Sequence, residues 1–297
     1  MRVLLSLAAV AAIALLLALW AGGGIDAIGQ WAAMQQRGFQ NTIATALRAA
    51  RAGEGGAVFA LLGACFAYGL AHAAGPGHGK VLIGGYGFGR AVPMVRLSVI
   101  ALLASLGQAV TAVALVYAGV LILNLGRASM IGITEQVMAP VSYGAIALIG
   151  LWLLWRGLRR IIGQRETHAH DHDGEVCNHC GHAHGPTLEQ VGQVGDLRTA
   201  LALIAGIAVR PCTGALFVLI ITWQMGIAPL GIAGAFAMAV GTAFVTIAVG
   251  IAASGLRGGL LAGLAGSTRL AQVASVVETI AGAAVFAIAL ALLLRAI

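Results

Sequence analysis

Long apolar runs dominate the chain, and short polar segments separate them. Asp, Glu, Lys and Arg are absent from Val3–Ile25, Gly55–Gly79, Leu97–Gly126, Gln136–Trp155, Pro211–Leu256 and Thr279–Leu294. About 20 apolar residues suffice to cross a bilayer as a helix. The pattern therefore predicts an all-α fold, a polytopic membrane helical bundle. Its six core transmembrane helices are expected near 56–74, 97–124, 138–160, 199–222, 228–254 and 270–295.

The first 55 residues precede this core and divide into two parts. Residues 1–24 place Arg2 ahead of a long apolar run, which predicts an N-terminal transmembrane helix or signal anchor, with a cleaved signal peptide as the alternative. Residues 25–55 are more polar. Apolar residues recur there at four-residue spacing, at Phe39, Ile43 and Leu47. This predicts an external amphipathic helix on the membrane surface, and a packed connecting helix is the alternative.

The composition agrees with a membrane protein and indicates its orientation. The chain is 60% hydrophobic and 9% charged, whereas soluble domains carry about 25% charged residues. The net charge of +7 comes mostly from arginines beside the apolar runs, so it reports topology rather than nucleic-acid binding. Placing Arg2 inside leaves eleven cationic residues inside and five outside, with Arg210 within the membrane. The count predicts a cytoplasmic N-terminus and an external C-terminus.

Two proline-interrupted segments resemble each other. Residues 74–81 align with 209–216 at an offset of 135 and share Pro76/Pro211 and Gly79/Gly214; a second match pairs Gly107-Gln-Ala with Gly241-Thr-Ala. The two units would have opposite topologies, and inverted repeats with paired broken helices are typical of transporters with a site at the repeat interface. The expected organisation is a first three-helix repeat at 56–162, a cytoplasmic His-rich loop at 163–198 and a second three-helix repeat at 199–297.

The first break carries two histidines. Gly75-Pro76-Gly77 must interrupt the helix, because proline removes a donor and glycine permits non-helical backbone. On a continuous helix His72 and His78 would point about 120° apart, so only the break lets them converge. Imidazole suits nickel, cobalt, copper and zinc. The sequence predicts metal ligation by both residues, and hydrogen bonding within the bundle is the alternative.

The second break offers a thiol and a hydroxyl, from Cys212 and Thr213. Cys212 is a candidate soft ligand, although a single cysteine in an apolar segment also serves as packing. Gln108 and Thr242 occupy equivalent repeat positions and could supply oxygen to the metal, or could tie helices together by hydrogen bonds.

Two opposite charges are expected inside the membrane, Arg210 and Glu278. Counted from the nearest inner arginines, their depths are similar, about 14–18 Å at 1.5 Å per residue. Because an intramembrane charge needs a partner or water, we expect an intramembrane pair or a proton path formed by these two residues.

The polar loop between the repeats is rich in metal-binding side chains. Thiolate, imidazole and carboxylate can all bind divalent metal, and a disordered linker is the alternative, compatible with metal binding. The candidate ligands here are His168, His170, His172, Cys177, His179, Cys180, His182 and His184. We expect the loop to collect or sense ions such as Ni, Co or Zn in the cytoplasm, and a reversible Cys177–Cys180 disulfide is a further alternative.

The helix ending in His-x-x-Gly-Pro-Gly-His-Gly-Lys, the second break with Pro-Cys-x-Gly and the His-rich loop together resemble the nickel/cobalt exporter (NicO) family. The resemblance extends from about residue 32 to the C-terminus. It implies an inner-membrane permease for Ni²⁺ or Co²⁺, with His72 and His78 as ligands and 168–184 as a metal-binding segment. Related importers use a histidine-and-aspartate motif, and 56–90 contains no aspartate, which favours export.

We therefore expect a transporter rather than an enzyme, with Ni²⁺ or Co²⁺ as the transported substrate and no resident cofactor. The chain has no Gly-x4-Gly-Lys-Ser/Thr motif, so an ion gradient or a partner subunit must supply the energy. The expected partners are divalent metal ions and the lipid bilayer, without nucleic acid, and a homo-oligomer is compatible with this interpretation. The alternatives are uptake of the same ions and a transmembrane thiol-disulfide electron carrier.

Overall fold

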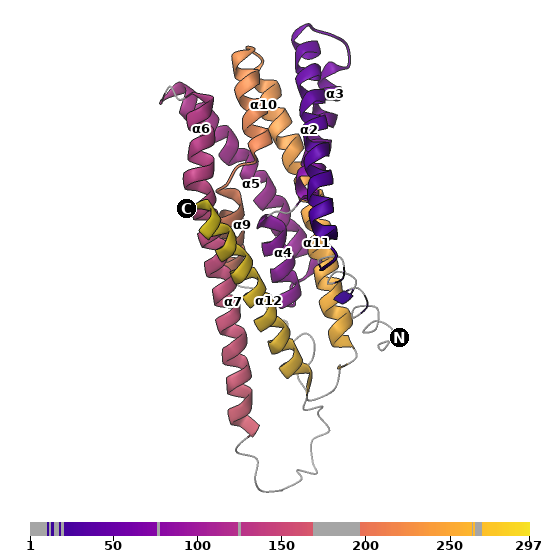
Figure 1. Ribbon diagram of the computed structural model, residues 1–297, viewed down its shortest axis with the longest axis vertical. Coiled ribbons are helices and arrows are strands. Elements are labelled where there is room, and N and C mark those ends of the chain that lie inside the picture. Colours follow the sequence, from indigo (N-terminus) through magenta and orange to yellow (C-terminus); the bar gives the residue numbers. More distant parts are fainter. Residues whose placement is uncertain are drawn as a thin grey trace.

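The computed structural model describes residues 11, 13, 14, 18, 21–75, 78–123, 126–168, 197–262, 264 and 269–297. Every regular element in these residues is helical (Figure 1). In chain order the elements are α2 (Gly24–Arg51), α3 (Ala57–Ala74), α4 (His78–Gly89), α5 (Met94–Leu121), α6 (Arg127–Ile133), the π-helical turn η1 (Thr134–Met138), α7 (Ala139–His168), α9 (Leu197–Ala208), α10 (Thr213–Gln224), α11 (Ala228–Ala262) and α12 (Arg269–Ala296).

Five helical stretches in the described residues are long and apolar enough to cross a membrane. They are Ala57–Ala74, Met94–Leu121, Arg127–Ile162, Ala228–Ala262 and Arg269–Ala296. The short helices α9 and α10 meet at an angle of 57° and would make a sixth span if counted together. The prediction of an all-α, multi-pass membrane protein is confirmed. The predicted N-terminal helix or anchor lies mostly outside the described residues.

Both predicted helix interruptions are present. α3 ends at Ala74 and α4 begins at His78, while α9 ends at Ala208 and α10 begins at Thr213. Gly75 is extended, with φ −65° and ψ 166°, because the residue before a proline avoids the helical region. The glycine-rich stretch after the first break forms the separate helix α4, of 12 residues.

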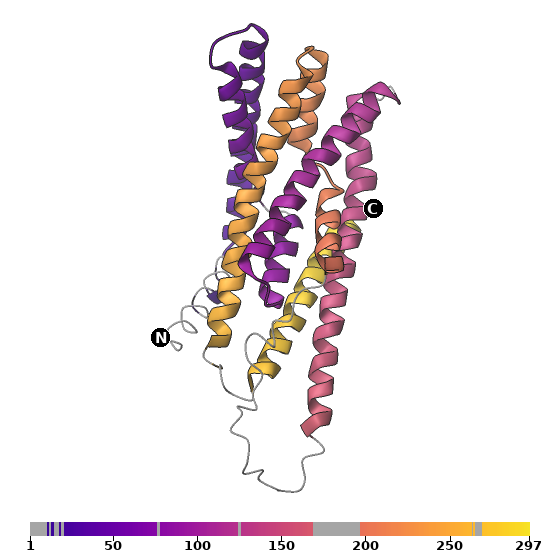
Figure 2. The same cartoon turned by 180° about the vertical axis from the view of Figure 1, so that it is seen from behind.

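The buried apolar side chains form two main clusters along the bundle. One joins α2, α3, α5, α10 and α11, and includes Leu61 and Leu219. The other joins α4, α5, α7, α9 and α12, and includes Leu82 and Leu203. Each interrupted segment thus contributes one helix to each cluster, and its break lies between them. Figure 2 shows α11 and α5 passing beside both regions.

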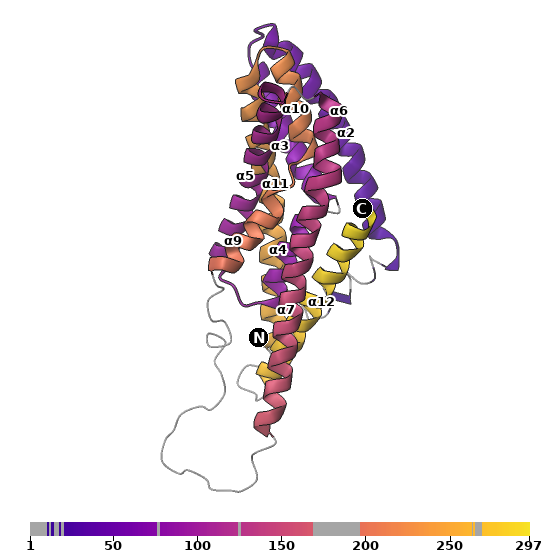
Figure 3. The same ribbon diagram turned by 90° about the vertical axis from the view of Figure 1, so that its left-hand side faces the viewer.

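Small residues allow the long helices to pack closely. A Cβ atom added at Gly282 of α12 would lie 2.4 Å from the backbone nitrogen of Leu154 in α7, and one added at Gly241 of α11 would lie 2.2 Å from the carbonyl oxygen of Phe66 in α3. Because lipid tails are as apolar as the side chains, such backbone approach and van der Waals packing hold helices together in a bilayer. Figure 3 shows α12 lying along α7.

The helix α2 packs alongside α3. Its buried Ile43 and Leu47 belong to the same apolar cluster as Leu61, and a Cβ atom added at Gly75 would lie 3.4 Å from the Cβ of Ala32. This is the arrangement of a packed helix, the second of the two interpretations of residues 25–55. It brings polar side chains of α2 to the first break.

Candidate functional site

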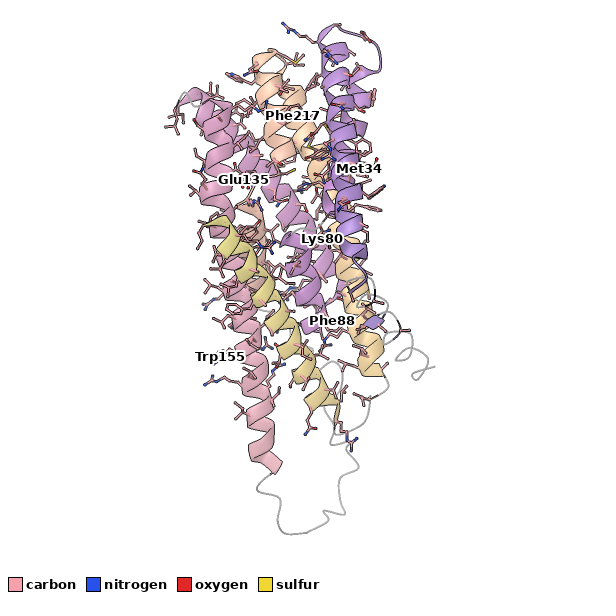
Figure 4. The ribbon with its side chains drawn as sticks, viewed as in Figure 1. Met34, Lys80, Phe88, Glu135, Trp155 and Phe217 are labelled. Carbon is pink, nitrogen blue, oxygen red and sulfur yellow. The ribbon has the colours of Figure 1, made fainter. Side chains whose placement is uncertain are left out.

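The two helix breaks lie next to each other in the middle of the bundle. A Cβ atom added at Gly79, in the first turn of α4, would lie 3.4 Å from Cγ2 of Ile207, near the end of α9. Figure 4 shows Lys80 near mid-height, with Phe217 toward one end and Phe88 toward the other. Non-helical backbone from two segments distant in sequence therefore shares one region between the two apolar clusters.

A histidine from the first break faces a cysteine from the second. The His72 imidazole, in the last turn of α3, interacts with the Cys212 thiol, which belongs to the N-cap residue of α10. In addition, Nδ1 of His72 lies 3.3 Å from Oε1 of Gln36 on α2. Both His72 and Cys212 are half-buried. The arrangement brings one nitrogen donor and one sulfur donor together.

Tyr68 interacts with both residues of this pair. Its ring stacks on the His72 ring with 6.0 Å between centroids and 8° between planes. The start of α10 lies against the same tyrosine, because a Cβ atom added at Gly214 would lie 2.3 Å from Cε1 of Tyr68. Tyr68 also interacts with the side chains of Gln40 and Thr213. Thr213 itself is exposed.

Two positive charges border the pair. The Lys80 ammonium donates a hydrogen bond to the carbonyl oxygen of Gly75, and so satisfies an acceptor at the end of α3. Lys80 and Arg210 both act electrostatically on His72. The charge of Arg210 is balanced in part by Glu135, whose Oε2 lies 3.1 Å from its Nη2.

Gln108 and Thr242 tie helices together. Nε2 of Gln108 on α5 donates to the carbonyl oxygens of Ile207 and Arg210, each at 3.2 Å. Oγ1 of Thr242 on α11 donates to the carbonyl oxygen of Gly69 at 3.4 Å. Both side chains therefore bind backbone next to the opposite break, as the hydrogen-bonding interpretation predicts. Their role as metal ligands stays a prediction.

The donor set suits a borderline metal ion, since imidazole and thiolate prefer first-row ions from cobalt to zinc. Among the described residues, no group of three or more His, Cys, Asp or Glu side chains converges to form a full coordination sphere. His72 and Cys212 supply two ligands, and the oxygens of Gln36 and Thr213 are nearby candidates for others.

Comparison with known families decides the affiliation of the chain. The NicO family profile, described as "High-affinity nickel-transport protein", matches residues 58–173 and 158–297. The chain belongs to the NicO family.

The name of a curated relative also refers to nickel. The NicO chain is 29% identical over 198 residues to a protein of Haemophilus influenzae (strain ATCC 51907 / DSM 11121 / KW20 / Rd) named "Putative nickel/cobalt efflux system". The match covers 61% of this chain and 61% of the relative, so the chain spans less than two thirds of that protein's length. No solved structure matches the NicO chain.

Several predicted ligands of this NicO chain lie outside the described residues. The backbone of His78 begins α4 and that of His168 ends α7, but their side chains are not among the described ones. Outside as well are His170, His172, Cys177, His179, Cys180, His182 and His184. The convergence of His72 with His78 and metal binding by the loop therefore stay predictions.

The predicted ion pair between Arg210 and Glu278 is wrong, because each residue has other partners. Arg210 binds Glu135 and also donates to the Tyr143 hydroxyl. Glu278 instead lies 2.9 Å from Nη1 of Arg160 and 3.4 Å from Nε of Arg156. The physical reason is that α7 packs against α12, and this contact brings Arg156 and Arg160, rather than Arg210, to Glu278. A proton path through either residue stays a prediction.

The sequence interpretation missed the contribution of α2 to the NicO site. Gln36 and Gln40 are four residues apart, so they share one face of α2, and both reach the α3 residues beneath the break. Gln36 and Gln40 are each seven residues before Ile43 and Leu47, so they continue the same face of α2, and the signal was the pair of polar residues on that otherwise apolar face. Glu135 was missed as well, although a carboxylate at the edge of an apolar run is a ready partner for an intramembrane arginine.

Proposed function

We propose that this NicO-family protein exports Ni²⁺ or Co²⁺ from the cytoplasm. The ion passes through the region where the two helix breaks lie next to each other, which we call the crossing. The observation that carries the proposal is the interaction of His72 from the first break with Cys212 from the second. The name of the Haemophilus influenzae relative supports efflux as the direction.

The chemistry of the crossing suits transient binding. An ion that leaves water must exchange its hydration shell for protein ligands, and imidazole and thiolate provide such replacements. A permease must also release its ion. Two strong ligands, with the cations Lys80 and Arg210 nearby, favour weaker binding than a closed four-ligand site would give.

Alternating access is proposed to come from two inverted three-helix repeats. The short helices α4 and α10 each have 12 residues and begin 135 positions apart, at 78 and 213, which is the offset found in the sequence. Packing supports the same relation. Gly241 of α11 contacts α3, whereas its counterpart Gly107 of α5 contacts Ala208 at the end of α9. Each central helix thus contacts the broken segment of the other repeat, where transporters bind their substrates.

Metal accumulation in a nickel- and cobalt-sensitive bacterial strain tests the proposal. Expression of the wild-type chain should lower cellular nickel or cobalt, and the variants His72→Ala and His78→Ala should remove the effect at equal membrane abundance. The variant Gln30→Ala changes an exposed polar residue of α2 that no described contact involves, and should behave as wild type. Unchanged metal content with the wild-type chain would refute export.

Uptake of the same ions is the second candidate, and the direction distinguishes it. Sealed inside-out vesicles that contain the chain should accumulate ⁶³Ni²⁺ if the protein exports it from the cytoplasm. Right-side-out vesicles should accumulate it if the protein is an importer.

The thiol-disulfide carrier is supported less well. Cys65 and Cys212 are free thiols in the described part of the chain. Cys65 lies within the α3–α11 contact, next to Gly234, and Cys212 faces His72. The two thiols therefore do not occupy equivalent positions at the two breaks.

A further inference from the structure

Four arginines gather around one carboxylate, away from the two breaks. Arg156 and Arg160 of α7 bind the two oxygens of Glu278. Arg257 of α11 interacts electrostatically with Glu278, Arg160 and Arg90, and Arg156 interacts with Arg90, at the end of α4. We call these five residues the arginine cluster.

Three members of the arginine cluster are buried, and the cluster carries an excess of positive charge. Arg90 and Arg257 are each 7% exposed and Glu278 is 2% exposed. In the part of the chain that the structure describes, Glu278 is the only carboxylate that interacts with the four guanidinium groups. Buried charges are normally paired, because desolvation without a partner is costly. Three positive charges here have no matching negative charge among the described side chains.

Unsatisfied hydrogen-bond donors face the same region. Nη1 of Arg90, Nε of Arg257 and Oγ of Ser254 are buried without a hydrogen-bond partner among the described residues, and so is one acceptor, Oε1 of Glu278. Ser254 lies beside the end of α4, since a Cβ atom added at Gly87 would lie 3.1 Å from its hydroxyl oxygen. Buried donors are nearly always satisfied in native proteins, and exceptions often mark an absent ion or ligand.

Aromatic rings hold two of the guanidinium groups in place. The Arg90 guanidinium lies 5.7 Å from the ring centroids of both Tyr86 and Trp152, and that of Arg156 lies 5.4 Å from Trp152. Such contacts orient the planar guanidinium groups without using their hydrogen-bond donors. Fixed guanidinium forks bind phosphate oxygens in a bidentate manner.

We propose that the arginine cluster binds a phosphate group, from either an anionic phospholipid or a free phosphate ion. The cluster lies toward the end of the bundle where α7 ends, near Phe88 and Trp155 in Figure 4. The charge count assigns that end to the cytoplasm, where anionic lipid attracts cationic side chains. Arg160 is 41% exposed, so the arginine cluster reaches the surface of the bundle at this residue. The bound group would supply the missing negative charge and link α4, α7, α11 and α12.

The test uses the full-length protein and two probes. The first probe is inorganic phosphate added to protein in neutral detergent. The second is a nanodisc of phosphatidylcholine with or without phosphatidylglycerol. Binding is followed by the unfolding temperature and by native mass spectrometry of retained phosphorus compounds. We expect the wild-type chain to bind at least one probe, with a matching rise in unfolding temperature. A response to phosphate identifies the free ion, and a response to phosphatidylglycerol alone identifies the lipid.

Three variants make the test specific. Arg90→Gln and Arg257→Gln remove the guanidinium groups that lack a carboxylate partner, and each should weaken binding at least tenfold. Arg159→Gln is the control, because Arg159 stacks on Trp155 at 4.4 Å outside the cluster; it should bind as the wild type does. Wild-type protein that binds neither probe overturns the proposal without any variant. An equal loss in all three variants also overturns it. If a glutamine variant does not fold, Arg257→Lys keeps the charge and should still lose bidentate binding.

Discussion

The His72 imidazole on α3 interacts with the Cys212 thiol at the start of α10. Each residue lies beside a break, because His72 is in the last turn of α3 and Cys212 is the N-cap residue of α10. The interruption at Gly75 ends α3 just after His72, and the extended Cys212 comes directly after Pro211 and before α10. Two local sequence signals thus create one contact between distant parts of the chain.

The first prediction concerns the thiol. In a background with Cys177 and Cys180 replaced by serine, Co²⁺ added to the purified chain should give a thiolate-to-cobalt charge-transfer band in the near ultraviolet. The Cys212→Ala variant should lose this band and its export activity, because Cys212 is then the thiol next to His72. The Cys65→Ala variant is the matched control, since Cys65 is buried against α11. A band that survives in Cys212→Ala would refute thiolate ligation.

The second prediction concerns the approach of α10 to Tyr68. A Cβ atom at Gly214 would lie 2.3 Å from Cε1 of Tyr68, so Gly214→Ala must displace the start of α10 or the tyrosine ring. We expect export to fall at least tenfold and stability to fall by about 1–3 kcal/mol, the usual cost of overpacking. Thermal unfolding and metal accumulation measure the two effects. Combination with Tyr68→Ala should restore part of the stability.

The matched control for this prediction is Gly132→Ala, because a Cβ atom there meets nothing within 4 Å. Gly132 lies inside the helix α6, where alanine is favoured over glycine by up to about 1 kcal/mol. This variant should therefore be as stable as the wild type or slightly more stable. Equal behaviour of Gly214→Ala and Gly132→Ala would show that α10 and Tyr68 do not pack closely.

The sequence was sufficient for the helices and their breaks because these depend on local properties. Apolar length alone determines where a span can form, and the spans of α3, α5, α11 and α12 appear where they were predicted. Proline and glycine act on the backbone of their own segment, so the interruption before His78 was also predictable.

Partners were harder to predict because they depend on helix rotation and on which helices pack together. Arg210 and Glu278 have similar counted depths, but depth does not specify which face of a helix a residue occupies. The packing of α7 against α12 brings Arg156 and Arg160 to Glu278. Glu135 lies in the π-helical turn η1 and binds Arg210. Neither pairing has a local sequence signal, because both depend on which helices pack together and with which faces.

The third prediction compares these two carboxylates. Glu278 is 2% exposed, and Glu278→Gln would leave its arginines without their carboxylate. Removing one member of a buried pair costs about 3–5 kcal/mol, and we expect the lower end because Arg160 is 41% exposed. The Glu135 side chain is 45% exposed, so Glu135→Gln should cost no more than about 1 kcal/mol. Thermal unfolding of both variants in one detergent tests the order, and an equal or reversed order would contradict it.

The fourth prediction concerns the charge of Lys80, which acts on His72 and donates to the Gly75 carbonyl. A dication bound beside His72 would be repelled by the ammonium group. At an effective dielectric constant of about 20, that repulsion is worth on the order of one to a few kcal/mol. Lys80→Met removes the charge at similar side-chain length. It should tighten Co²⁺ binding on the order of tenfold, and it should slow export because the ion is released less readily.

The measurement is calorimetric titration of the purified protein with Co²⁺, together with initial export rates in sealed vesicles. Replacing the loop histidines between 168 and 184 with asparagine, and Cys177 and Cys180 with serine, keeps loop binding from masking the membrane site. Lys80→Arg is the control, because it preserves the positive charge, and its affinity should stay within about threefold of the wild type. Loss of the hydrogen bond to Gly75 should cost Lys80→Met about 0.5–1.5 kcal/mol of stability, which unfolding measurements separate from the change in affinity. Binding that is unchanged or weaker in Lys80→Met would show that this charge does not weaken the metal site.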